Sequence, residues 1–262
     1  MHSRSLLGFA LLLTLSLVAA ACGGGQPAAP PAGEQPAAAP AAVDPATAAN
    51  INGKITLEGT APPNEPIKMN ADPVCLKTAT GPQTAETFVV GEGGGLGNVF
   101  VYVKDGLGSR TFPAPTEPVT IDQKACRYYP HVMGVMVGQP LQIVNSDPTL
   151  HNIHATPKAN TEFNTGQPIQ GMKTDRVFTA PEVMVPFKCD VHGWMNAYAG
   201  VLNHPFFAVT PADGTFSIKG LPPGTYTIEA WHEKLGPMTQ SVTVAEKETK
   251  DANFTFKAGS GN

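Results

Sequence analysis

Hydrophobic and polar residues alternate with a period of two in several short stretches between residues 51 and 257, and no stretch of twelve residues there sustains a helical period. The alternation is clearest in five segments, which are residues 54–58, 98–103, 225–230, 241–244 and 253–256. Turn signals such as Asp213-Gly214 and Pro222-Pro223-Gly224 lie between them. The pattern predicts an all-β fold made of sandwiches.

The amino terminus has a different pattern. An uncharged apolar run follows Arg4 and ends in small residues before Cys22. Since the run is shorter than the roughly 20 residues that cross a bilayer, residues 1–21 are predicted to be a signal peptide. The small residues before Cys22 and the glycines after it resemble a bacterial lipoprotein signal, which implies that Cys22 is acylated. The alternative is a simple cleaved signal beside a spare cysteine.

Residues 22–50 are predicted to be a tether. Positions 23–50 hold 11 Ala, 6 Pro and 4 Gly, so 21 of these 28 side chains are unable to build a core. Such a spacer suits a lipid-anchored domain that stands clear of a membrane surface. The chain is therefore expected in the bacterial cell envelope, on the periplasmic or outer face.

Composition narrows the function classes. The chain has 17 basic and 21 acidic side chains, so no basic surface for nucleic acid is indicated. The chain has 27 glycines and 26 prolines, and so many helix-breaking residues are not typical of a helical bundle. Nucleic acid is therefore not expected to be a partner of this protein.

Three residues with soft or nitrogen donors recur at intervals of three. Cys189, His192 and Met195 lie on one loop that turns at Gly193. A thiolate, an imidazole and a thioether so close together suit a copper ion that cycles between two oxidation states. A second imidazole is needed, and the sequence offers His151 after a proline-containing turn.

The two motifs together resemble the cupredoxins, the type 1 blue copper proteins, and specifically the plastocyanin and amicyanin branch. The resemblance implies a Greek-key β-sandwich over residues 121–202 that holds one copper ion. It makes His151, Cys189 and His192 the equatorial ligands and Met195 the axial ligand. It also implies that the Asn152 backbone N–H bonds the thiolate and that its side chain ties the two ligand loops together.

His154 is an alternative to His151. If the segment is extended, residues three apart point to opposite faces of a strand, so only one of the two imidazoles can face the ion. The resemblance favours His151, and His154 is then expected at the surface or behind the ligands. Trp194, between two proposed ligands, is either a core residue or part of a contact surface.

Cys75 and Cys126 remain once Cys22 and Cys189 have been assigned. An exported protein normally pairs its cysteines, and a disulfide here would close a long loop worth about 4 kcal/mol in the chain-entropy model. The alternative is a second metal site in which the two cysteines join His131.

The carboxy-terminal part resembles a second family. The stretches 213–218 and 221–232 are similar to the carboxypeptidase regulatory-like β-sandwich, a structural accessory of the transthyretin or immunoglobulin type. Residues 53–59 look like its first strand. Residues 51–120 and 203–257 are therefore expected to form one sandwich with the copper domain inserted, and a tandem array is the alternative.

These features predict a one-electron carrier that exchanges electrons with a redox partner protein through an exposed His192 edge. No enzyme activity is expected, because no His-x-His or His-Cys-His pair could bring further coppers. The alternatives are a copper-delivery lipoprotein and a structural surface module with a vestigial site.

Overall fold

The computed structural model describes residues 43–259 of the chain. The predicted signal peptide (residues 1–21), the proposed lipidation site Cys22 and most of the predicted tether lie outside the described residues. The tether was expected to extend to residue 50, whereas the first strand already begins at Ala49. Within residues 43–259, no helix is long and apolar enough to span a membrane.

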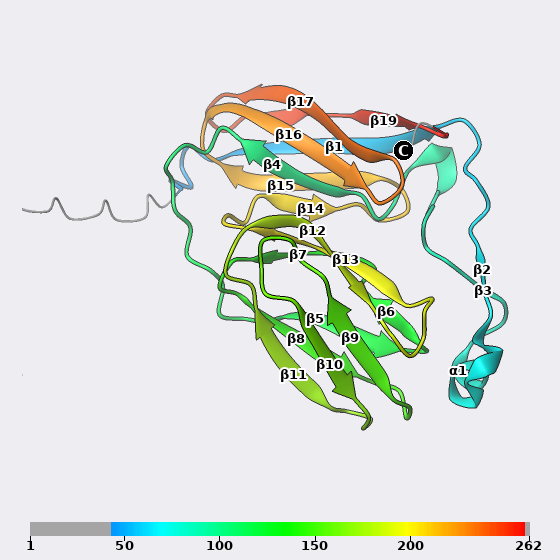
Figure 1. The fold of residues 1–262 in the computed structure, drawn as a ribbon. Helices are drawn as coiled ribbons and strands as arrows, with labels where there is room; N and C mark the ends of the chain where they lie inside the picture. The colour runs from blue at the N-terminus through cyan, green and yellow to red at the C-terminus, as the bar shows by residue number, and fades with distance from the viewer. Residues whose placement is uncertain (1–42, 260–262) are drawn as a thin grey trace, which may run out of the picture. The chain divides into compact units, whose positions relative to one another are not determined.

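Strands from both ends of the described chain form one sandwich, called here the split sandwich (Figure 1). Its strands are β1 (Ala49–Glu58), β4 (Phe100–Asp105), β14 (Phe207–Val209), β15 (Thr215–Leu221), β16 (Gly224–His232), β17 (Gly236–Val244), β18 (Thr249–Asp251) and β19 (Phe254–Lys257). One sheet has the order β15-β1-β18, with β19 also paired to β1, and the other has the order β14-β4-β16-β17.

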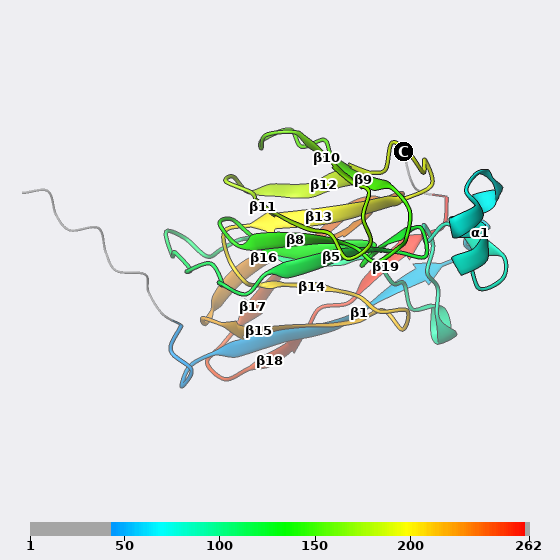
Figure 2. The same cartoon turned by 90° about the horizontal axis from the view of Figure 1, so that it is seen from below.

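The strands between β4 and β14 form a second sandwich, called here the inserted sandwich. They are β5 (Val119–Lys124), β6 (Arg127–Tyr129), β7 (Val132–Met136), β8 (Pro140–Asn145), β9 (His151–Ala155), β10 (Phe163–Gln167), β11 (Lys173–Val177), β12 (Glu182–Lys188) and β13 (Asn196–Leu202). Its sheets have the orders β10-β9-β12-β13-β7 and β11-β8-β5-β6. The prediction of an all-β fold with two sandwiches is confirmed, and Figure 2 shows the strands as successive layers.

The insertion follows from one pairing. β14 runs antiparallel to β4 with Phe207 opposite Tyr102, although the whole inserted sandwich lies between these strands in the chain. β1 likewise pairs with β15, β18 and β19. The amino-terminal strands thus complete a sheet pair whose remaining strands come from the carboxy-terminal end.

Two glycines allow the sandwiches to pack closely. A Cβ at Gly200 of β13 would lie 2.3 Å from the Phe100 ring, and one at Gly134 of β7 would lie 2.2 Å from the Phe207 ring. Any larger residue would displace an aromatic ring, so these positions need glycine. Phe100 also joins Val132 in a buried apolar cluster that contains side chains of both sandwiches.

Residues 66–84, called here the cap segment, pack against the inserted sandwich and not against the split sandwich that surrounds them in the chain. They contain β2 (Pro66–Ile67), a 3-10 turn (Met69–Ala71), α1 (Pro73–Thr78) and β3 (Gln83–Thr84); a second 3-10 turn, Glu92–Gly94, follows the segment. Met69 and Cys75 are buried in the core of the inserted sandwich. The expected grouping of residues 51–120 with the split sandwich is therefore wrong for the cap segment, because its apolar residues find their partners elsewhere.

Helix α1 begins at a strong local signal. The Asp72 carboxylate accepts hydrogen bonds from the backbone N–H groups of Val74 and Cys75, at 2.7 and 3.4 Å, and Pro73 occupies the first turn. An N-cap aspartate satisfies otherwise unpaired amide groups, and proline fits this position because its missing N–H is not needed. The cap also fixes the orientation of the Asp72 carboxylate, which matters for the site below.

Candidate metal centre

Two loops at one end of a sheet supply the predicted ligands. His151 is the first residue of β9, and Cys189 directly follows β12. β12 pairs with both β9 and β13, so the loop from Cys189 to Met195 lies beside the start of β9. Residues that are 41 positions apart, His151 and His192, are thereby brought into contact.

The donor atoms of three predicted ligands face one another. The Nδ1 atoms of His151 and His192 are 2.9 Å apart, and the Cys189 sulfur lies 3.9 Å from Nδ1 of His192. All three donors lie within 4.8 Å of one another. The three residues are at most 2% exposed, so the donor set lies in the protein interior.

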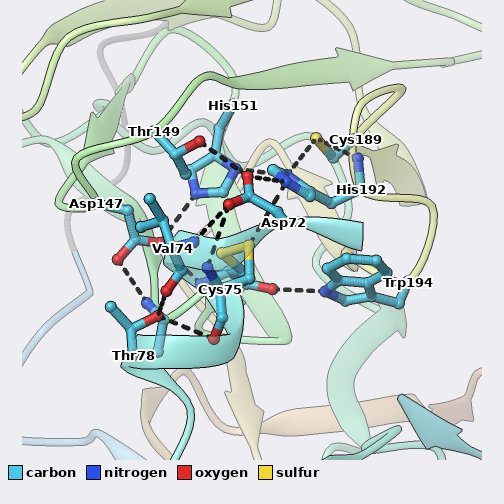
Figure 3. The surroundings of a disulfide bond; sticks show 12 residues. Asp72, Val74, Cys75, Thr78, Asp147, Thr149, His151, Cys189, His192 and Trp194 are labelled. Atoms are coloured by element: carbon cyan, nitrogen blue, oxygen red, sulfur yellow. Dashed lines mark hydrogen bonds and ion pairs between the residues drawn. A yellow bond between two sulfur atoms is a disulfide. The ribbon is translucent and has the colours of Figure 1, made fainter. Parts of the chain in front are cut away.

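The outward nitrogen of each ring is bound to a carboxylate (Figure 3). Nε2 of His151 lies 2.9 Å from an Asp147 oxygen, and Nε2 of His192 lies 3.0 Å from an Asp72 oxygen. This leaves both Nδ1 atoms turned toward the Cys189 thiol. Metal-bound histidines are held in this way by partners on their second nitrogen. Two imidazoles and a thiolate, all inward-facing, are a donor set that fits a copper ion.

Asn152 ties the two ligand loops together. Its side-chain oxygen accepts hydrogen bonds from the backbone N–H groups of Asp190 at 2.8 Å and Val191 at 3.3 Å, and the thiol of Cys189 points at the same oxygen. The Asn152 backbone also acts on the Cys189 sulfur by a hydrogen bond. These are the contacts that the resemblance implied for this residue.

The surroundings favour the thiolate form of Cys189. Burial raises the pKa of this thiol, but hydrogen bonds from His151 and from the backbone N–H groups of Asn152, Val191 and His192 lower it more, so the net shift is downward. A thiolate is the form that binds a metal ion.

The pKa values of the two imidazoles shift in opposite directions. Burial lowers the pKa of His151, but the hydrogen bond and charge of Asp147, together with the Cys189 sulfur, raise it to about 9. Burial and the nearby charge of His151 lower the pKa of His192, against an opposing effect of Asp72. The surroundings thus favour the protonated form of His151 and the neutral form of His192.

Met195 lies in the same buried cluster as Cys189. Its backbone N–H donates to the His192 carbonyl at 2.9 Å, and its carbonyl accepts from the Cys189 N–H at 3.1 Å. These two bonds close the ligand loop into a compact turn. The axial role of its thioether stays a prediction.

His154 lies outside the donor group. Its Nδ1 is 3.0 Å from Asp190, and its Nε2 is 2.7 Å from Glu162 at the surface. His151 and His154 belong to the same strand, β9, and the alternation of that strand directs only His151 inward.

Cys75 and Cys126 form a disulfide bond. Their sulfurs are therefore not available for the alternative second metal site. His131, which that site would have used, binds the Asn196 carbonyl through Nδ1 at 3.1 Å and Glu233 of the split sandwich through Nε2 at 2.7 Å. His131 is thus a contact between the sandwiches.

The expectation of an exposed His192 edge is wrong. The residue is 2% exposed, because Asp72 and the disulfide sulfur of Cys75, 3.5 Å from Nε2, cover it. Trp194 is half-buried, its ring centroid is 5.1 Å from that of His192, and its indole N–H donates to the Cys126 carbonyl at 2.9 Å.

Sequence reasoning missed two residues at the site, Asp72 and Asp147. Asp147 lies four positions before His151 in the same loop, and this spacing was a usable signal. Asp72 lies 120 positions before its partner His192, and only the disulfide-linked cap segment brings it there. No local pattern points to that contact.

Comparison with known proteins gives two partial likenesses. Residues 200–257 match the family described as Carboxypeptidase regulatory-like domain. No curated protein matches the chain.

Among solved structures, the chain is similar to a Cu-containing nitrite reductase from Thermus scotoductus SA-01, with 23% identity and a TM-score of 0.32 over 38% of this chain and 25% of that one. It is also similar to a purple cupredoxin from Nitrosopumilus maritimus, with 21% identity and a TM-score of 0.28 over 32% and 98% of the two chains. A Cu(I) form of a mutant amicyanin has 16% identity and a TM-score of 0.29 over 38% and 97%. The chain thus spans a quarter of the reductase.

Proposed function

We propose that the protein holds one type 1 copper ion between His151, Cys189 and His192, with Met195 as a weak axial ligand, and that it is a one-electron carrier. The convergence of two imidazole Nδ1 atoms and a thiol in the interior carries this proposal. When bound, copper would supply a site that is oxidised and reduced by one electron. The protein's residues keep the donors in one arrangement in both states.

Burial of the ligands favours a carrier over a copper-delivery protein. Transfer of the metal itself requires an acceptor to reach the donor atoms, and His151, Cys189 and His192 are each at most 2% exposed. The Asn152 contacts to Asp190 and Val191 hold the ligand loop in place against the first loop. A buried site whose two loops are joined by hydrogen bonds supports electron exchange without loss of the ion.

Electrons leave through Trp194 in this proposal. The His192 edge is covered, whereas Trp194 beside it on the same loop is only half-buried. We expect Trp194→Leu to slow electron exchange with a small redox protein while the midpoint potential stays unchanged. An unchanged rate would exclude this route.

The cellular role follows from the amino-terminal sequence. The apolar run before Cys22 and the Ala/Pro/Gly-rich stretch after it support a lipid-anchored protein of the bacterial cell envelope that meets a redox partner protein there. The proposed role is electron exchange alone, without conversion of a substrate.

Repeated redox cycling tests the function. The copper-loaded protein is oxidised and reduced at an electrode in the presence of a strong Cu(I) chelator, and chelated copper is followed by its colour. We expect a reversible one-electron couple with copper retained over many cycles, and Cys189→Ala as the control without that couple. Rapid appearance of chelated copper on the first reduction would favour delivery and contradict the carrier.

A further inference from the structure

The two carboxylates behind the imidazoles come from separate parts of the chain. Asp147 belongs to the loop between β8 and β9, and Asp72 belongs to the cap segment. Each binds Nε2 of one imidazole, at 2.9 Å for His151 and 3.0 Å for His192. The pair is therefore built by tertiary structure and not by one motif.

One disulfide orients both carboxylates. The backbone N–H of Cys75 donates to Asp72 at 3.4 Å, and the backbone N–H of Cys126 donates to Asp147 at 2.7 Å. Cys75 and Cys126 are bonded to each other. Figure 3 shows the disulfide below Asp72 and the two imidazole rings, with Asp147 to its left.

Further bonds remove the remaining freedom of each carboxylate. Asp72 also accepts from the Val74 N–H at 2.7 Å and the Thr149 hydroxyl at 2.9 Å. Asp147 also accepts from the Ala125 N–H at 2.8 Å. Thr149 belongs to the same loop as Asp147, so it joins the cap segment to the first ligand loop. Neither carboxylate can turn without breaking several hydrogen bonds.

We propose that Asp72 and Asp147 are positioning residues for the two imidazole ligands, and that the Cys75–Cys126 disulfide holds this pair of carboxylates in register. The consequence for a copper ion rests on the proposed function. A carboxylate on Nε2–H strengthens the imidazole as a donor and adds negative charge beside the ion, and both effects favour Cu(II) over Cu(I).

The principal test is Asp72→Asn, because Asp72 is the N-cap of a short helix and its amide analogue still caps α1. Loss of such a partner lowers metal affinity by about 10- to 100-fold. We expect Cu(II) affinity to fall within that range and Cu(I) affinity to fall less, so that the potential rises; a tenfold change in the affinity ratio is about 59 mV for one electron. Asp147→Asn should act in the same direction.

Glu162→Gln is the matched control. Glu162 binds Nε2 of His154 at 2.7 Å, so this variant removes a carboxylate from a neighbouring imidazole that is not in the donor group. We expect its potential to equal that of the unmodified protein. If the potential shifts equally in Asp72→Asn and Glu162→Gln, the shift comes from the loss of any nearby negative charge. That result would overturn the positioning role of Asp72.

Nitrogen NMR of the metal-free protein tests the contact without copper. The unmodified protein should show a slowly exchanging Nε2–H on both rings, and Asp72→Asn should lose that signal for His192 alone. An absent signal for His192 in the unmodified protein would overturn the inference, whatever the protein does with copper. A normal NMR result in a protein that forms no type 1 centre would instead leave the carboxylate pair standing and contradict the proposed function.

The double variant Cys75→Ala, Cys126→Ala tests the role of the disulfide. If it folds, both Nε2–H signals should exchange at least tenfold faster, because both carboxylates lose their common support. Unchanged exchange in the folded double variant would contradict the role of the disulfide. If it does not fold, the double variant Cys75→Val, Cys126→Ala, which fills more of the buried space, gives the same readout.

Discussion

Within residues 43–259, histidine and carboxylate side chains meet in two buried clusters, and one of these has the geometry of a candidate metal centre. At the candidate centre, His151 and His192 each bind a carboxylate through Nε2, and their Nδ1 atoms face inward. At the contact between the sandwiches, His131 uses both ring nitrogens, on Asn196 and on Glu233. The difference lies in the inward nitrogens, because those of His151 and His192 face each other and the Cys189 sulfur, whereas those of His131 face a backbone carbonyl and a carboxylate.

The clusters also differ in charge. Asp147 and the Cys189 sulfur raise the pKa of His151 to about 9 against the effect of burial. Beside Glu233, burial lowers the pKa of His232 to about 4, and its ring packs on those of Phe88 and Phe256. Burial thus favours the neutral form of the His232 imidazole, whereas Asp147 and the Cys189 sulfur favour the protonated form of His151.

The largest expected effect is on the visible absorption spectrum, which should change with a substitution in the candidate centre and not with one in the His131 cluster. Cys189→Ser should abolish the intense visible absorption of the Cu(II)-loaded protein, because the thiolate-to-copper charge transfer is lost. His131→Ala should leave that absorption intact. Absorption spectra of both variants decide the matter, and a Cys189→Ser protein that keeps its colour would refute the ligand assignment.

In a stability experiment, we expect the ranking of these two variants to reverse. His131→Ala leaves the Glu233 carboxylate buried with only Tyr198 at 3.3 Å, and removal of one partner of a buried pair costs about 3–5 kcal/mol. Urea denaturation of the metal-free protein measures this loss. Cys189→Ser should cost less, and the opposite ranking would undo the structural role given to His131.

A smaller effect concerns acid. Burial lowers the pKa values of both His204 and His232 to about 4, below the about 6.5 of an unfolded histidine. The unfolded chain therefore binds more protons between these values, so stability is full above pH 6.5 and falls as the pH approaches 4. The loss is about 3 kcal/mol for each residue. Urea denaturation at several pH values checks it, with His232→Phe expected to flatten the slope.

Sequence patterns predicted what depends on local order. Alternation in segments such as 225–230 indicated strands, and the spacing of Cys189, His192 and Met195 indicated one ligand loop. The covering of His192 by Asp72 depends on a long-range disulfide that redirects the cap segment to the inserted sandwich. Because Asp72 and His192 lie 120 positions apart in the chain, no periodicity or local motif could show their contact.

The smallest expected effect is at the axial position. Met195→Leu should keep a blue site and raise its potential, because loss of a weak donor disfavours the oxidised ion, and Met195→Gln should lower it through a stronger oxygen donor. Met184, buried at the contact between the sandwiches, is the control, and its replacement should leave the potential unchanged. Voltammetry that finds a shift only at Met184 or Met172 would overturn the axial assignment.

The most direct test of the central claim is the absorption and EPR spectrum of the Cu(II)-loaded protein. A centre of two imidazoles and one thiolate predicts an intense band near the red end of the visible spectrum and a narrow copper hyperfine splitting. Weak absorption with a wide hyperfine splitting would mean that Cys189 does not bind the copper, and it would contradict the metal centre proposed here.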